Sequence, residues 1–199
     1  MNPRRLKLSA ILLSALLAGV ILGGWTQTWF DIKLTTGQSL AVTGDIAAPA
    51  LTALALCVLV LLGALAIAGP FFRVVLAVIE ALIGVAVVYS AVLAVTDPAS
   101  ASAAAITTAT GVGGKESTSE LVDTVSATPW PWFTLVAGVL VILTALLILV
   151  TSRAWPGSSR KYQAVRLEEP VTDGATPTKE RSSVDDWDAL SSGEDPTGK

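Results

Sequence analysis

Glu80 is the only charged residue in an apolar run that extends from residue 74 to residue 95. A run of this length is long enough for a helix to cross the hydrocarbon core of a membrane. Glu80 follows Arg73 by seven positions, or about 10 Å along a helix. Its short side chain cannot easily reach water from that depth, so we expect the carboxyl group to be largely protonated unless water enters. Acidic residues inside membranes tend to be functional, as proton carriers or substrate contacts.

Two hydroxyl side chains fall at a depth similar to that of Glu80. Ser14 comes seven residues after Lys7, and Thr144 comes nine residues before Arg153. At the rise of an α-helix, Ser14, Glu80 and Thr144 fall in the same half of the bilayer, on three different helices. A buried polar layer is therefore possible. It is either a proton-coupled or substrate-contacting site, or a hydrogen bond that holds the bundle together or joins it to a second copy. The structural interpretation carries more weight.

Other chemistry has little support in this sequence. There is no histidine and only one cysteine, Cys57, so the commonest general base and metal ligand is missing and no internal disulfide can form. The acidic residues Asp185, Asp186 and Asp188 are typical of a solvated face rather than a cation site. No basic patch with interleaved aromatic residues suggests nucleic-acid binding. We expect no enzymatic activity, no metal, no cofactor and no nucleic-acid partner.

Four apolar runs must position the candidate polar layer. The sequence is 52% hydrophobic and only 15% charged, whereas a soluble domain has typically about a quarter charged residues. A chain segment in hydrocarbon must satisfy its own backbone hydrogen bonds, which favours helices. We expect an all-α membrane protein that contacts the lipid bilayer. Its fold is expected to be a four-transmembrane-helix antiparallel bundle, with helices at about residues 8–25, 47–68, 71–95 and 130–151.

The first apolar run has two further features. Basic residues precede it, as they do in a secretory signal peptide, but no good small-x-small cleavage site follows, so we expect it to be retained as a helix. Ala15, Gly19 and Gly23 recur at every fourth position along it. Such a stripe allows another helix to approach closely, although small residues are abundant throughout this chain.

The segments between the helices differ in character. Phe30, Ile32 and Leu34 alternate with polar residues, and Leu40 and Val42 resume the alternation after a glycine-containing turn. This period of two predicts a small extracytoplasmic β-hairpin, which must lean on the helix ends because an isolated hairpin is only marginally stable. Residues 99–128 are rich in small and hydroxyl residues and predict a mobile loop with helical turns at about 101–108 and 117–125.

Tryptophans flank the apolar runs, where amphipathic rings favour the membrane–water interface. The expected interface anchors are Trp25, Trp29, Trp130, Trp132 and Trp155.

The positions of the basic residues predict the orientation of the bundle. Of the 13 Lys and Arg residues, only Lys33 and Lys115 fall on the side opposite the N-terminus. The positive-inside rule therefore predicts a cell-membrane protein with both termini in the cytoplasm.

Residues 152–199 form a polar cytoplasmic tail that we expect to be mostly disordered. A short helix is expected at about residues 184–191, because Ser183 with Asp186 resembles an N-cap. Val184, Trp187 and Leu190 would then share one face. This face is either a docking site for a cytoplasmic protein or an unbound, transient turn.

Several local motifs carry a resemblance that covers most of the chain. They are Trp29 after the first helix, residues 42–44 leading to Pro49, Leu51, Ala53 and Leu54, the segment 128–132 that opens the last helix, Trp155 with Tyr162, and the segment 187–197. In these features the chain resembles the Trp biosynthesis-associated transmembrane protein family of actinobacteria. The resemblance implies four helices and a link to tryptophan biosynthesis, but no mechanism and no catalytic residue.

Two functions follow as hypotheses. The first is a non-enzymatic membrane protein associated with tryptophan biosynthesis that presents its tail to a cytoplasmic partner. The alternative is a small transporter or permease subunit for tryptophan, indole or a related aromatic compound. Four helices are few for a transport path, so a transporter of this kind is expected to be a homodimer.

Overall fold

Four long helices account for most of the described chain. They are α1 (Pro3–Trp25), α3 (Ala50–Ile67), α4 (Pro70–Thr96) and α8 (Trp130–Thr151). Each is long and apolar enough to cross a membrane. Pro70 lies in the first turn of α4, where a missing backbone N–H costs no helical hydrogen bond, so α4 can begin directly after α3 ends. The predicted bundle of four apolar helices is confirmed.

The computed structural model describes residues 3–152. The predictions that concern residues 153–199 fall outside the described residues: the mostly disordered tail, the short helix at 184–191, its face of Val184, Trp187 and Leu190, and the interface position of Trp155.

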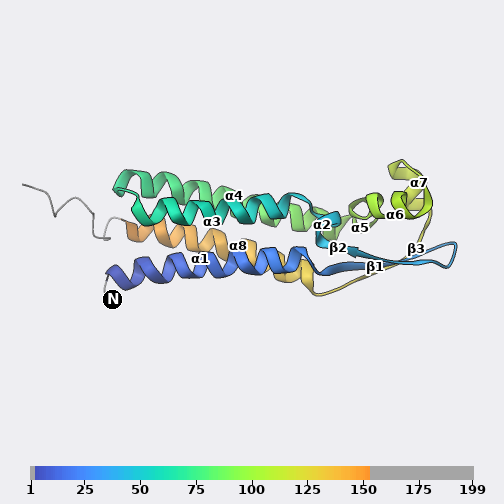
Figure 1. The fold of residues 1–199 in the computed structure, drawn as a ribbon, viewed down its shortest axis with the longest axis horizontal. Helices are drawn as coiled ribbons and strands as arrows, with labels where there is room; N and C mark the ends of the chain where they lie inside the picture. The colour runs from blue at the N-terminus through green and yellow to red at the C-terminus, as the bar shows by residue number, and fades with distance from the viewer. Residues whose placement is uncertain (1–2, 153–199) are drawn as a thin grey trace, which may run out of the picture. The chain divides into compact units, whose positions relative to one another are not determined.

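The four helices lie side by side with neighbours running in opposite directions (Figure 1). α1 packs against α3 and α8, and α4 packs against the same two helices. α1 and α4 therefore face each other diagonally across the bundle. The N-terminal end of α1, the α3–α4 turn and the C-terminal end of α8 lie at one end, which we call the basic end because Arg5, Lys7 and Arg73 lie there (Figure 1).

Glycines set the distance between α4 and α8. A Cβ atom placed on Gly84 of α4 would lie 2.7 Å from Ile142 Cγ1 and 3.1 Å from the carbonyl oxygen of Gly138, both on α8. A Cβ atom on Gly138 would in turn lie 2.9 Å from side-chain atoms of Val87 and Val88. Small residues of this kind let two helix backbones approach closely.

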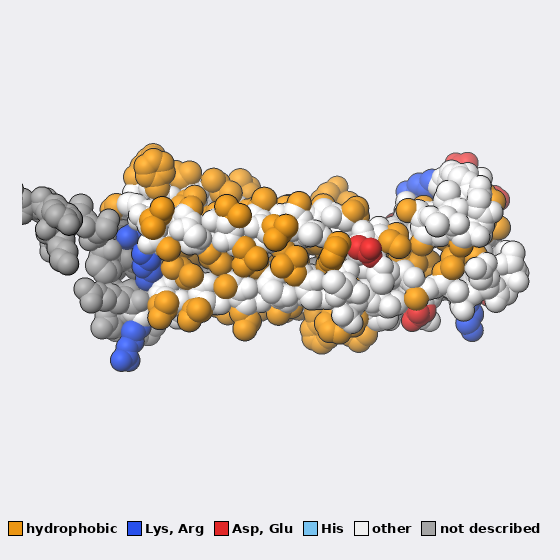
Figure 2. All heavy atoms as spheres, viewed as in Figure 1, with side chains coloured by type: hydrophobic (Ala, Val, Ile, Leu, Met, Phe, Trp, Pro, Cys, Tyr) orange, Lys and Arg blue, Asp and Glu red, His pale blue; other side chains and the backbone are white. Residues whose placement is uncertain are grey.

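The outer surface of the bundle is apolar. Large side chains such as Leu16, Val60 and Val150 are 62%, 75% and 82% exposed. On the face drawn in Figure 2 the Lys and Arg side chains gather at the two ends and leave the helical middle free of them. An exposed apolar surface of this extent is typical of a surface that contacts lipid.

A three-stranded sheet covers the opposite end of the bundle, the sheet end (Figure 1). β1 (Thr28–Leu34) pairs with β2 (Ser39–Thr43) as the predicted hairpin, and Gly37 in its turn has a φ of 85°. β3 (Val122–Ala127) pairs antiparallel with the other edge of β1, so the strand order is β2-β1-β3. The prediction of helical turn for residues 117–125 is wrong from residue 122 onward, because the β1 edge is open and accepts these residues as a strand.

The rest of the segment predicted as a loop contains short helices. They are α5 (Pro98–Ala101), α6 (Ala103–Thr110) and α7 (Lys115–Glu120), and α2 (Gly44–Ala47) joins the hairpin to α3. The helical turn predicted at about residues 101–108 agrees with α6, and the start of the one predicted at 117–125 agrees with α7. Asp97 begins α5 by accepting a hydrogen bond from the Ser100 backbone N–H at 3.0 Å.

The hydrophobic core runs from the bundle into the sheet. Trp29, Phe30 and Ile32 of β1 are completely buried and belong to the same cluster as Ile21 of α1 and Val87 of α4. The sheet is therefore packed on the helix ends, as an isolated hairpin would require.

Candidate functional site

The centre of the bundle holds one hydrogen-bonded polar pair. The Ser14 hydroxyl of α1 donates to Glu80 Oε1 of α4 at 2.6 Å, and both side chains are completely buried. The bond spans the diagonal of the bundle, because α1 and α4 are not neighbours in the ring of helices. Two of the three residues predicted to share a polar layer therefore meet.

The spacing of residues along α4 explains the position of Glu80. The buried residues of α4 recur at intervals of three and four, which places them on one helical face: Arg73, Ala77, Glu80, Gly84, Val87, Ala91 and Ala94. Most of them are small, so the helix approaches its neighbours closely on either side of the carboxyl group. The same packing excludes solvent from Glu80, whose side chain is 0% exposed.

The second oxygen of the Glu80 carboxyl group makes no hydrogen bond within the described residues. Oε2 is buried and has no hydrogen-bond partner among residues 3–152. A buried polar atom without a partner costs free energy, and such atoms in native proteins call for an explanation in terms of function or an additional ligand. The pair can therefore act in two ways, as a brace between α1 and α4 or as a group that exchanges a proton.

Thr144 does not join the Ser14–Glu80 pair. Its side chain is buried, but its hydroxyl donates to the Leu140 carbonyl of its own helix at 2.8 Å. A threonine in a helix commonly makes this bond to the preceding turn, so the placement of Thr144 in the polar layer, which rested on similarity of depth alone, is wrong.

Cations stabilise the basic end of the bundle. Lys7 Nζ donates to the Ala66 carbonyl at 2.8 Å, and Arg73 Nε donates to the Ala68 carbonyl at 2.9 Å. These carbonyls lie at the C-terminal end of α3, where helical partners are lacking and the helix dipole favours positive charge. The two residues tie α1 and α4 to the end of α3.

The tryptophans of the described residues fall into different environments. Trp130 and Trp132 are 37% and 54% exposed and remain available as interface anchors, and Trp25 is half-buried. Trp29, which was predicted with them, lies instead in the core, with its Nε1 donating to the Gly24 carbonyl at 2.8 Å. The indole satisfies a carbonyl at the C-terminal end of α1 and has no lipid-facing surface.

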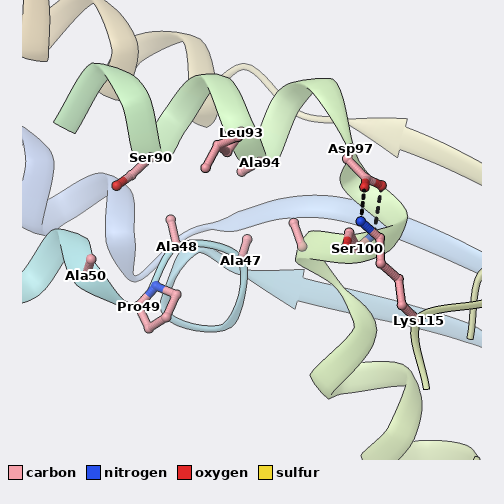
Figure 3. Close-up of a pocket in the computed structure, with 11 residues that line it drawn as sticks. Ala47, Ala48, Pro49, Ala50, Ser90, Leu93, Ala94, Asp97, Ser100 and Lys115 are labelled. Carbon is pink, nitrogen blue, oxygen red and sulfur yellow. Dashed lines mark hydrogen bonds and ion pairs between the residues drawn. The ribbon is translucent and has the colours of Figure 1, made fainter. Parts of the chain in front are cut away.

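A pocket of about 430 Å³ lies at the sheet end, between the α2–α3 junction and the C-terminal end of α4 (Figure 3). Lys115 Nζ lies 3.0 Å from Asp97 Oδ2 at one side of it. The Ser100 backbone N–H and, after it, Lys115 hold the pKa of Asp97 below its ordinary value of 3.8. No motif in the sequence predicts this pocket. Its only signals were the helix end at Asp97-Pro98 and the rarity of lysine on this side of the bundle.

Four apolar helices of membrane-spanning length around a buried polar pair define a small integral membrane protein. Residues 11–197 match the family model of the tryptophan-associated transmembrane proteins, and the chain belongs to that family. Neither the curated proteins nor the solved structures contain a match to the chain.

Proposed function

We propose that this chain is a non-enzymatic membrane anchor of tryptophan biosynthesis that presents its C-terminal tail to a cytoplasmic protein. The observation that carries the proposal is the closed centre of the bundle, where Ser14 and Glu80 join α1 to α4 across the diagonal. A bundle braced at its centre is suited to hold a segment at the membrane.

The basic end supports the cytoplasmic side of the proposal. Arg5, Lys7 and Arg73 lie there, and α8 also ends there, so the chain leaves the bundle toward the tail at this end. By the positive-inside rule, this end faces the cytoplasm. The proposed docking face is Val184, Trp187 and Leu190, which a helical turn would place together.

Affinity capture from the native membrane tests the tail. The full chain is compared with a chain lacking residues 183–197 and with a Trp187→Ala chain. Ser192→Ala is the matched control, because Ser192 belongs to the deleted segment but lies on the side of a helical turn away from the docking face. We expect the deletion and Trp187→Ala to lose the same captured protein while Ser192→Ala keeps it. An unchanged set of captured proteins in the deletion contradicts the proposal.

A second function is favoured by one specific observation, the unpartnered Oε2 of Glu80. A carboxyl oxygen of this kind suits a proton-coupled carrier of tryptophan, indole or a related aromatic compound, working as a homodimer. Glu80→Gln separates the two functions, because glutamine can still accept the hydrogen bond from Ser14 but cannot ionise.

Fluxes of labelled tryptophan and indole decide between the two functions. Uptake and efflux are measured in a deletion strain that carries either the wild-type chain or Glu80→Gln. An anchor gives equal fluxes in all strains and unchanged growth without tryptophan for Glu80→Gln. A carrier gives a flux that the deletion and Glu80→Gln both abolish while the variant stays in the membrane.

A further inference from the structure

The pocket at the sheet end combines an apolar wall with a pair of opposite charges. Its volume of about 430 Å³ falls within the range of roughly 300–1,000 Å³ that is usual for small-molecule sites. The wall is lined by small and apolar side chains from the α2–α3 junction and from α4: Ala47, Ala48, Pro49, Ala50, Leu93 and Ala94. The sticks in Figure 3 show these side chains on both sides of the space.

The charged pair at the side of the pocket is open to solutes. The side chains of Asp97 and Lys115 are 48% and 71% exposed, although their charged atoms lie only 3.0 Å apart. A solvent-exposed ion pair contributes little to stability, so an incoming ligand can separate it at little cost. Asp97 keeps its position when the pair opens, because the Ser100 backbone N–H still holds its Oδ1.

We infer that this pocket binds a free α-amino acid with a large apolar side chain. The ligand ammonium lies on the Asp97 carboxylate, the ligand carboxylate lies on the Lys115 ammonium, and the side chain lies against the alanine-rich wall. A zwitterion replaces the one ion pair by two charge-assisted contacts, which are stronger than hydrogen bonds between neutral groups. The alanines leave the space that a broad side chain needs. The site is independent of the tail and of Glu80.

Radiolabelled L-tryptophan is the probe, because it carries the largest apolar side chain of the common amino acids. Binding to the full chain is measured in phosphatidylcholine nanodiscs, since this lipid supplies no primary ammonium group. Tryptamine lacks the carboxylate, and indole-3-propionate lacks the ammonium. We expect each analogue to compete at least about tenfold less well than unlabelled L-tryptophan, because each loses one charged contact. This comparison uses only the wild-type chain.

Variants then assign the contacts. Asp97→Asn keeps an oxygen for the Ser100 N–H but removes the charge, and Lys115→Gln removes the opposite charge. Each is expected to weaken L-tryptophan binding about tenfold or more. Asp31→Asn and Lys33→Gln are matched controls, since both residues are exposed on β1 and neither lines the pocket. The controls are expected to bind as the wild type does.

Three results overturn the inference. L-tryptophan fails to bind the wild-type chain, or both analogues compete as well as L-tryptophan, or the Asp97 and Lys115 variants bind as tightly as the controls. Circular dichroism and gel filtration verify that each variant is folded. If a pocket variant fails to fold, the analogue comparison on the wild-type chain still decides.

Discussion

Replacing Gly84 by alanine tests how tightly α4 and α8 pack. The new Cβ atom would lie 2.7 Å from Ile142 Cγ1 and 3.1 Å from both the Gly138 carbonyl oxygen and the Ile142 backbone nitrogen. Carbon atoms pack at about 3.5–4.0 Å. The Ile142 side chain can move, but the backbone atoms of α8 cannot move without shifting the helix.

The expected magnitude is the balance of two terms. Overpacking in a well-packed interior costs about 1–3 kcal/mol, whereas replacing glycine by alanine within a helix stabilises by about 0.5–1 kcal/mol. Gly84→Ala should therefore lower the free energy of unfolding by about 0–2.5 kcal/mol. Gly19 of α1 is the matched control, because no atom lies within 4 Å of its Cβ position. Gly19→Ala should raise the free energy of unfolding by about 0.5–1 kcal/mol.

Reversible unfolding in bicelles, followed by circular dichroism, measures both variants. Equal stabilities of Gly84→Ala and Gly19→Ala would show that α4 and α8 do not pack closely at Gly84. A loss of stability in Gly19→Ala, together with a change in oligomeric state, would show instead that a second copy packs on the stripe of Ala15, Gly19 and Gly23.

Three other predictions concern single side chains. A double-mutant cycle of Ser14→Ala and Glu80→Leu, each of which removes the hydrogen bond, should give a coupling energy of about 0.6–1.7 kcal/mol in unfolding experiments. A coupling energy near zero would show that the Ser14–Glu80 hydrogen bond does not stabilise the bundle. The pKa of Asp97 in the folded protein lies below its ordinary value of 3.8. The stability that the ionised carboxylate gives to the start of α5 is therefore fully present above pH 3.8 and is lost as the pH falls through the lower pKa of the folded protein. Amide exchange of Ser100, corrected for its intrinsic rate, should be protected at pH 6 and lose protection only in strong acid; loss of protection already at pH 5 would contradict this. Trp29→Phe should cost about 1–3 kcal/mol of unfolding free energy, because it removes a buried hydrogen bond and leaves space in the core. A stability equal to wild type would count against the buried position.

The helices and the central pair could be predicted because both depend on regular spacing along the chain. An apolar run of about 20 residues has few alternatives to a helix in lipid. The constant rise of the helix then places Ser14 and Glu80 at equal depth, and their hydrogen bond agrees with that placement. Depth alone does not determine to which acceptor a hydroxyl group donates its hydrogen bond. Thr144 has an acceptor in its own preceding turn and uses it.

β3 and the position of Trp29 could not be predicted because they depend on tertiary contacts. Nearly every residue of β3 is exposed, so the strand has no buried face and no hydrophobic alternation to reveal it. Its backbone pairing with β1 alone makes it a strand. A tryptophan after an apolar run is typical of an interface anchor, and only the packing of β1 on the helix ends buries Trp29.

The pairing of β1 with β3 has a consequence for the order of assembly during synthesis. β1 follows the first helix, whereas β3 comes after the third membrane-length helix, so the hairpin of β1 and β2 can form before its third strand has been synthesised. Thr128, which precedes α8, is bonded to the start of β1. Its hydroxyl donates to the Thr28 carbonyl at 2.7 Å, and its backbone N–H donates to the Trp29 carbonyl at 2.9 Å. The last helix is thus fastened to the first one only after both helices between them have been inserted. A chain truncated before residue 122 would leave the β1 edge unpaired, and such an edge is a template for pairing with other chains.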